Sequence, residues 1–165
     1  MDKKEFKSIN EHDIENNFSK DECVKNIANL IIDQDFGVLA TKGESTTYGS
    51  LVSLIVNDDM KRLLFATPNY TRKYKFLSQF DDVAMLVDNR NKEKNISKIA
   101  AVTILGTARE LTELPDISRA KSLLLKKHHY LSELFSSAGC AIFQIDVKRY
   151  CYVTHIQEVY EWRPV

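Results

Sequence analysis

The stretch Phe65-Ala66-Thr67-Pro68-Asn69-Tyr70-Thr71-Arg72-Lys73-Tyr74 joins three structural signals in a few residues. The apolar run that ends at Ala66 predicts a strand, and Thr67-Pro68-Asn69 is a cluster of turn-forming residues. After the turn, apolar and aromatic residues recur at helical spacing, at Tyr70, Tyr74, Leu77 and Phe80. The sequence therefore predicts a strand, a turn, and a helix over about residues 70–79.

Thr71, Arg72 and Lys73 would stand at the start of that helix. The first backbone N–H groups of a helix have no partner within it, and the positive end of the helix dipole favours an anion. Arginine adds a planar fork of donors, and lysine adds a point charge. These residues suit a phosphate group. By themselves they also fit an ordinary basic helix start that faces water.

The rest of the chain predicts several short strands joined by turns. The expected strands cover residues 36–41, 46–56, 61–66, 83–87, 100–111, 140–147 and 149–162. Expected helices cover 19–31, 70–79 and 116–127, with a further turn over 130–135. Strands at such short spacing predict a closed or nearly closed antiparallel barrel. We expect one domain over residues 19–165, preceded by a polar N-terminal arm over 1–18.

Composition restricts the class of protein. The chain has 165 residues, of which 44% are hydrophobic and 28% charged, and its formal net charge is zero. This balance argues against nucleic-acid binding driven by bulk charge. No apolar run approaches the roughly 20 residues of a membrane helix, and no secretory signal is evident. Cys23, Cys140 and Cys151 form no Cys-x-x-Cys pair, so we expect no metal site and a cytoplasmic location.

Three further segments surround the opening stretch. They are Tyr48-Gly49-Ser50-Leu51-Val52-Ser53, the strand that ends in Asp88-Asn89-Arg90, and Ala100 to Glu110. Over about Phe36 to Glu110 the chain resembles the FMN-binding split β-barrel family, the pyridoxamine 5′-phosphate oxidase-like flavoproteins. The resemblance implies a mainly β fold: a six-stranded antiparallel split β-barrel with flanking helices, which works as a homodimer.

The resemblance also implies a site for FMN between the two subunits. The residues implied to hold its phosphate are Thr67, Thr71, Arg72 and Lys73. Those implied to hold its ring system, largely through backbone groups, are Ser50, Leu51, Val52 and Ala66. Asn89, after the fourth strand, is implied to hydrogen-bond the ring or the ribityl chain.

The implied activity is that of an oxidoreductase, which transfers electrons or a hydride between a reduced nicotinamide and a small acceptor. No side chain is assigned a catalytic role, because the flavin carries the redox chemistry. The oxidase itself usually has an arginine where this chain has Tyr48-Gly49-Ser50, so we do not expect oxidation of pyridoxamine phosphate. A non-catalytic flavin- or haem-binding split-barrel protein is the alternative, and the deazaflavin F420 is a possible replacement for FMN.

The histidines offer few other sites. His128 and His129 lie in a basic run and do not share a helix face, so we expect them on the surface rather than on a metal. His155, in a C-terminal strand, is a conceivable haem ligand. The sequence contains no Gly-x-Ser-x-Gly elbow, no Walker-type loop and no Gly-x-Gly-x-x-Gly, which argues against hydrolase, P-loop and Rossmann sites.

Overall fold

The strands form one antiparallel sheet that closes on itself. The computed structural model describes residues 20–154 and 158–164. The strands are β1 (Phe36–Lys42), β2 (Thr47–Val56), β3 (Arg62–Pro68), β4 (Asp82–Asp88), β5 (Ala100–Glu110), β6 (Cys140–Thr154) and β7 (Glu158–Trp162). Their order is β3-β2-β1-β4-β5-β6-β7, and β3 also pairs with β6. This last pairing closes β1 to β6 into a six-stranded barrel, which confirms the predicted fold class.

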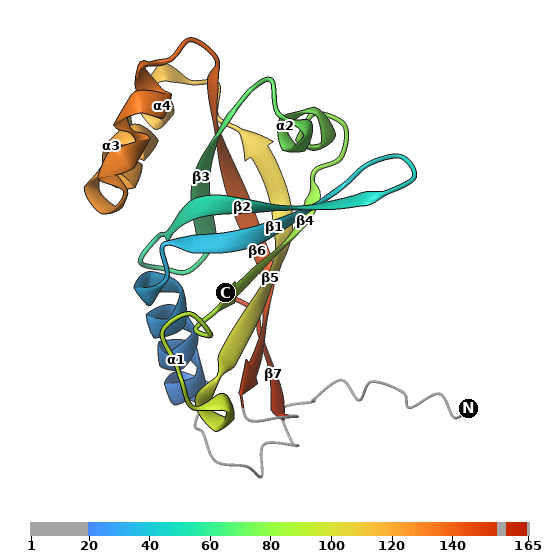
Figure 1. Cartoon of the computed structure of the whole chain (residues 1–165), viewed down its shortest axis with the longest axis vertical. Helices are drawn as coiled ribbons and strands as arrows, with labels where there is room; N and C mark the ends of the chain where they lie inside the picture. Colours follow the sequence, from blue (N-terminus) through green and yellow to red (C-terminus); the bar gives the residue numbers. More distant parts are fainter. Residues whose placement is uncertain (1–19, 155–157, 165) are drawn as a thin grey trace.

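Helices flank both ends of the barrel. They are α1 (Lys20–Asp33), α2 (Arg72–Leu77), α3 (Leu114–Lys127) and α4 (Ser132–Ser136), with 3-10 turns η1 (Ile96–Lys98) and η2 (His129–Leu131). Figure 1 shows α1 beside one end of the barrel, and α2 and the α3–α4 pair at the other. Within the described ranges, no helix has the length and apolar character needed to cross a membrane.

The barrel interior is the main hydrophobic core. Along β5 the buried and less buried residues alternate, as expected for a strand with one face inward. Phe65 on β3 and Phe143 on β6 stack inside with ring centroids 5.4 Å apart, and both are almost fully buried. A second, smaller core lies between α3 and the outer face of the barrel, and consists of Ala66, Leu111, Ala120, Leu124, Leu131 and Ile142.

The C-terminal half of the sheet differs from the sequence prediction. Residues 140–154 form one long strand, β6, although a break at Lys148 was predicted. The second predicted strand, over 149–162, is not continuous, because β6 ends at Thr154 and β7 is a separate strand that pairs antiparallel with it. The pairing with β5 shifts by one residue at Lys148, because Leu105 is opposite Arg149 whereas Gly106 is opposite Val147. Lys148 is therefore the extra residue of a β-bulge. Gly106 permits the close approach, since a Cβ there would lie 2.4 Å from the carbonyl oxygen of Asp146.

The remaining predicted elements are found with small shifts in their ends. The helix predicted over 70–79 is shorter, because α2 runs from Arg72 to Leu77. The predicted arm over residues 1–18, the cap at Ser19 and His155 lie outside the described residues.

Candidate functional site

Two threonine hydroxyls meet at the start of α2. Thr71 is the N-cap, and its Oγ1 accepts a hydrogen bond from the backbone N–H of Tyr74 at 3.4 Å. The same hydroxyl donates to the carbonyl oxygen of Pro68 at 2.9 Å and lies 3.1 Å from Oγ1 of Thr67. Thr67 is almost fully buried at the end of β3. Because α2 has only 6 residues, its dipole is small, and side chains must supply most of the charge.

The first two cations of α2, Arg72 and Lys73, lie against β2. Lys73 donates from Nζ to the carbonyl oxygen of Leu51 at 3.2 Å. The guanidinium group of Arg72 lies 5.2 Å from the centre of the Tyr48 ring, within the range of a cation–π interaction. The structure thus brings the predicted phosphate-binding residues beside the strand predicted to hold the ring, although the two segments are separated in the sequence.

The charges of Arg72 and Lys73 are not balanced by acidic side chains. Neither residue takes part in an ion pair with any carboxylate in residues 20–154 or 158–164. Lys73 is half-buried, and burial lowers the pKa of its ammonium group below the ordinary value. A charge held away from water without a partner is unfavourable, so this end of the molecule is suited to receive an anion.

Ser50 supplies a second unsatisfied group. Its hydroxyl oxygen is buried and has no hydrogen-bond partner among the described residues. Buried polar atoms are nearly always paired, so an orphan of this kind needs an explanation. Ser50 directly precedes Leu51, whose carbonyl oxygen accepts from Lys73. Alternation along β2 puts the Ser50 side chain on the same face as that of Tyr48, which Arg72 approaches, and on the opposite face from that of Leu51.

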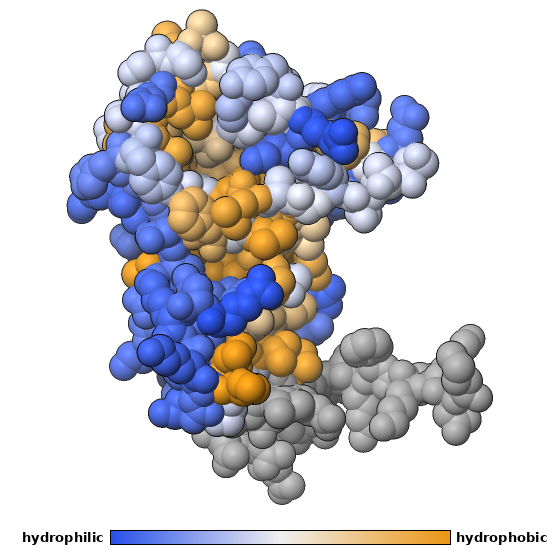
Figure 2. Space-filling model, in the orientation of Figure 1, coloured by the Kyte–Doolittle hydropathy of each residue, from blue (hydrophilic) through white to orange (hydrophobic). Residues whose placement is uncertain are grey.

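An apolar surface continues from Leu51 across the outside of the sheet. The register places Leu51 beside Val38 of β1, and Val38 beside Leu86 of β4. Leu51 is 61% exposed, which is unusual for a strand residue of this size. The three side chains line an open cavity of about 290 Å³, together with Asp88 and Arg90, which pair at 3.1 Å. Figure 2 shows apolar side chains gathered over this part of the sheet.

The other residues predicted for the site have different positions. Val52 and Ala66 are buried, so only their backbone groups could contact a ligand. Asn89 follows β4, two strands away from β2, and its side chain holds the following loop closed. Its Oδ1 accepts from the N–H of Ala100 at 2.9 Å, and its Nδ2 donates to the carbonyl oxygen of Lys98 at 3.3 Å. The structure does not bring Asn89 to the α2 cluster of the same chain.

His128 was not recognised from the sequence as a buried residue. It is 1% exposed, so the prediction of a surface position is wrong. Its Nε2 bonds to the carbonyl oxygen of Leu54 at 2.9 Å, which requires a proton on that nitrogen. The hydroxyl of Tyr130 lies 3.4 Å from Nδ1 of His128 and 2.8 Å from Oγ of Ser53. This network attaches the end of α3 to β2, three residues beyond Ser50.

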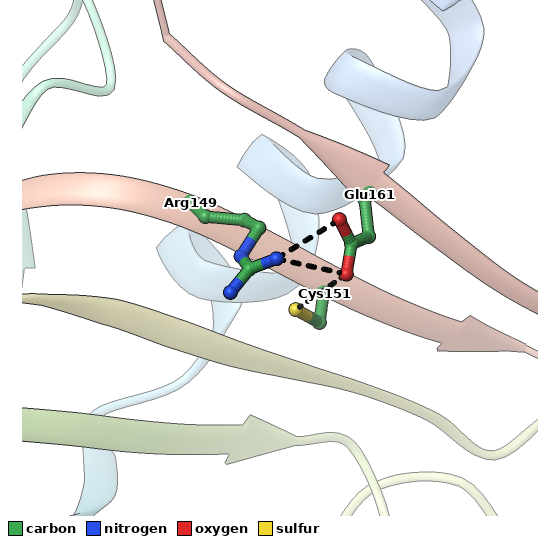
Figure 3. Close-up of polar contacts among 3 residues, drawn as sticks. All are labelled: Arg149, Cys151 and Glu161. Atoms are coloured by element: carbon green, nitrogen blue, oxygen red, sulfur yellow. Dashed lines mark hydrogen bonds and ion pairs between the residues drawn. The ribbon is translucent and has the colours of Figure 1, made fainter. Parts of the chain in front are cut away.

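A third polar cluster joins β6 and β7 (Figure 3). Arg149 donates from Nη1 to both carboxylate oxygens of Glu161, at 3.3 and 3.2 Å. The thiol of Cys151 lies 3.9 Å from the same carboxylate. Burial, followed by the negative charge of Glu161, raises the pKa of Cys151. A thiol in this state is a poor nucleophile, so the cluster does not resemble a reactive-cysteine site.

Comparison with known proteins gives a result at the level of the fold. No known family model and no curated protein sequence matches this chain. Solved structures do. A Clostridium acetobutylicum protein related to general stress protein 26, of the pyridoxinephosphate oxidase family, matches with a TM-score of 0.68 and 14% identity, over 88% of this chain and 96% of that one.

Two other similar structures are of proteins that are named for the cofactor they bind. A FAD-binding protein from Mesorhizobium loti matches with a TM-score of 0.63 and 15% identity, over 82% of this chain and 94% of that one. A heme binding protein from Mycobacterium smegmatis matches with a TM-score of 0.72 and 15% identity, over 83% of this chain and 56% of that one. With its closed six-stranded barrel, this chain has the split-barrel fold of the pyridoxamine 5′-phosphate oxidase-like proteins.

Proposed function

We propose that this protein binds FMN and acts as an FMN-dependent oxidoreductase, which passes electrons or a hydride between a reduced nicotinamide and a small acceptor. One observation carries the proposal. Arg72 and Lys73, which have no acidic partner among the described residues, lie against the strand that holds the buried, unpaired hydroxyl of Ser50. The site has a cationic end and, next to it, an apolar surface at Leu51. FMN has matching parts, a phosphate and a flat ring system.

Different residues of the site bind different parts of FMN. Arg72 and Lys73 hold the phosphate through charge-assisted hydrogen bonds. The hydroxyls of Thr67 and Thr71, which donate to the carbonyl oxygen of Pro68 in the ligand-free protein, exchange that acceptor for phosphate oxygens. Ser50 donates to a polar atom of the cofactor. Bound FMN supplies the redox chemistry, while the protein orients the ring and limits access of water. No side chain is assigned a proton-transfer role.

We further propose that a second copy of this chain completes the site. The cavity beside Leu51 is open on its outer side, and Val153 on β6 and Val159 on β7, farther along the sheet, are 37% and 42% exposed. A homodimer formed through this face would enclose the flavin at the interface and cover the exposed residues. Light scattering should then give twice the monomer mass of 19.0 kDa. A monomer that still binds FMN tightly would contradict the dimer.

The similar structures support a cofactor-binding role but leave its identity to experiment. One is described as FAD-binding and another as heme binding, so FAD and haem are alternatives to FMN. F420 is the further alternative named from the sequence. All three cysteines are free in the structure, which is consistent with the cytoplasmic location that we propose.

The test is an absorption spectrum of the purified protein, followed by titration with FMN. Oxidised-flavin bands and saturable binding support the proposal, whereas a Soret band would favour haem. Colourless protein that does not bind FMN would refute flavin binding.

Arg72→Ala/Lys73→Ala should weaken FMN binding at least about 100-fold, because each charge-assisted bond contributes about 1.5–3 kcal/mol. The matched control, Lys25→Ala/Lys126→Ala, removes two exposed helix cations and should leave affinity unchanged. Steady oxidation of NADH or NADPH would distinguish an enzyme from a flavin-binding module.

A further inference from the structure

A second cavity lies between α3 and the outer face of β3, β5 and β6. Its volume is about 170 Å³. Its lining residues are Asn57, Arg62, Leu64, Arg109, Leu111, Asp116, Arg119, Ala120, Leu123 and Gln144. None of them belongs to the α2 site. The register explains how the strands contribute, because Leu64, Gln144 and Arg109 stand side by side on three neighbouring strands.

Positive charge dominates this cavity. Arginines reach it from three elements: Arg62 from β3, Arg109 from β5 and Arg119 from α3. Arg109 pairs with Asp146 at 3.3 Å, but Arg62 and Arg119 form no ion pair with another residue in the described part of the chain. Asp116 is the one acidic side chain in the lining. The walls therefore carry more guanidinium groups than carboxylates.

Gln144 gives the cavity a hydrogen-bond acceptor that no described residue uses. The residue is 7% exposed, and its Nε2 donates to Oδ1 of Asp146 at 2.6 Å. Because a carboxylate can only accept, this contact fixes which end of the amide is nitrogen. The carbonyl oxygen of the same amide accepts no hydrogen bond from any described residue. An acceptor that no described residue uses, on a nearly buried residue, therefore shares the cavity with guanidinium donors, and Leu64 and Leu111 form the apolar part of the wall.

We propose that this cavity binds a small organic acid that carries a hydroxyl group. Its carboxylate or phosphate would contact Arg62 and Arg119, and its hydroxyl would donate to the carbonyl oxygen of Gln144. Guanidinium groups match the planar geometry of both acid groups. A cavity of about 170 Å³ has room for a molecule with a three-carbon skeleton.

Calorimetric titration at constant ionic strength tests the proposal with two probes, glycerol 3-phosphate and D-glycerate. At least one should bind, and the tighter one identifies the acid group. Arg62→Gln and Arg119→Gln should each weaken binding about tenfold, which is about 1.4 kcal/mol. Lys25→Gln, which removes an exposed cation from α1, is the matched control and should have no effect. Inorganic phosphate, which cannot reach both the arginines and Gln144, should bind more weakly than glycerol 3-phosphate.

The α2 site could also bind a phosphate, so the same titrations are made with Arg72→Ala/Lys73→Ala. Unchanged affinity in that variant supports a separate site, whatever the result with FMN. Loss of binding there, with retention in Arg62→Gln and Arg119→Gln, would overturn the proposal. So would the absence of binding by both probes. Equal affinity for inorganic phosphate and glycerol 3-phosphate would overturn the role of Gln144. Circular dichroism of each variant checks that α3 remains folded.

Discussion

Two groups of basic side chains on this barrel differ in what faces them. Arg149, on β6, has both carboxylate oxygens of Glu161 within hydrogen-bonding distance. Arg72 and Lys73, on α2, face the Tyr48 ring and the Leu51 carbonyl oxygen, with no carboxylate of the described residues paired to either. The first arrangement is complete within the chain. The pair on α2 carries positive charge that no acidic side chain of the described residues balances. This difference, rather than the number of cations, is the reason for proposing an anionic ligand at α2.

The two sites also differ in solvation. The side chains of Arg149 and Glu161 are 36% and 37% exposed, so water screens both charges and the pair contributes little. Lys73 is half-buried, and its pKa is lowered by that burial. An ammonium group without an acidic partner at this half-buried position lowers the free energy of unfolding of the ligand-free protein. A bound phosphate would remove part of that cost, which couples ligand binding to stability.

The most severe test gives the α2 site the carboxylate that it lacks. Thr71→Asp retains a good N-cap, so the helix and the melting temperature should be little changed. The new negative charge would lie beside the bound phosphate and neutralise the cations. Since unit charges 4 Å apart interact by about 4 kcal/mol at a dielectric constant of 20, FMN affinity should fall at least about 100-fold. Fluorescence titration measures this, and unchanged affinity would show that the phosphate binds elsewhere.

Lys73 should make binding depend on pH. As pH rises through its lowered pKa, the ammonium loses its charge and FMN affinity should fall by up to about tenfold, beginning below the ordinary lysine value of about 10.4. The ligand-free protein should respond in the opposite direction. The unfolded chain then binds more protons at this position, so its contribution to stability rises with pH.

Lys73→Arg is the control for that experiment, because arginine stays charged throughout the range. Above about pH 7.5, where the phosphate is already a dianion, the variant should bind FMN with an affinity that is nearly independent of pH up to about pH 10. A wild-type curve that coincides with the variant curve would show that Lys73 does not contact the phosphate.

A smaller effect separates two serines on β2. Ser50 has no described partner for its hydroxyl, whereas Oγ of Ser53 lies 2.8 Å from the Tyr130 hydroxyl. Ser50→Ala should leave the ligand-free protein as stable or slightly more stable, yet weaken FMN binding by about 0.5–1.5 kcal/mol. Ser53→Ala should do the reverse, lowering stability by about 1 kcal/mol with little change in affinity. Urea unfolding and FMN titration of both variants measure the four values.

The smallest effect is expected at the completed pair. Glu161→Gln removes the ion pair to Arg149, and its half-exposed geometry limits the loss of stability to about 0.2–1 kcal/mol. Urea unfolding of the variant provides the value. A loss of several kcal/mol would mean that the pair is more buried in solution than in this chain alone, as an interface between two copies would make it.

Much of the fold could be predicted from the sequence because its strands are short, alternating and bounded by turn residues. The same local signals failed at Lys148, where a charged Val-Lys-Arg-Tyr sequence resembles a turn. Backbone pairing with β5 carries the strand through that point. The predicted surface position of His128 was wrong for a similar reason. Its neighbours in the sequence are basic, but the end of α3 turns it onto the carbonyl oxygen of Leu54, a contact between distant segments.

The candidate site was predictable to a similar degree. Thr71, Arg72 and Lys73 follow a strand and turn, and their local pattern placed them correctly at a helix start. Their alignment with Ser50 and Leu51 depends on how α2 packs on β2, which the resemblance implied but no local pattern could show. The unpaired state of the cations was not predictable, because it depends on where every acidic side chain lies. The role predicted for Asn89 stays a prediction.

The bulge in β6 has a consequence for how the sequence can change. Before it, the odd-numbered Phe143 and Ile145 face the barrel core, and after it the even-numbered Tyr150 and Tyr152 do. Because of the one extra residue, the side chains that face the core change from odd-numbered to even-numbered positions. Deleting Lys148 would remove the bulge and leave a regular strand, because Val147 and Arg149 already pair with neighbouring residues of β5. Both tyrosines would still face the core. A one-residue deletion between Phe143 and Ile145, or between Tyr150 and Tyr152, would instead turn one set of these side chains to the outside. The bulge is therefore a place where this strand can change its length and keep its hydrophobic pattern.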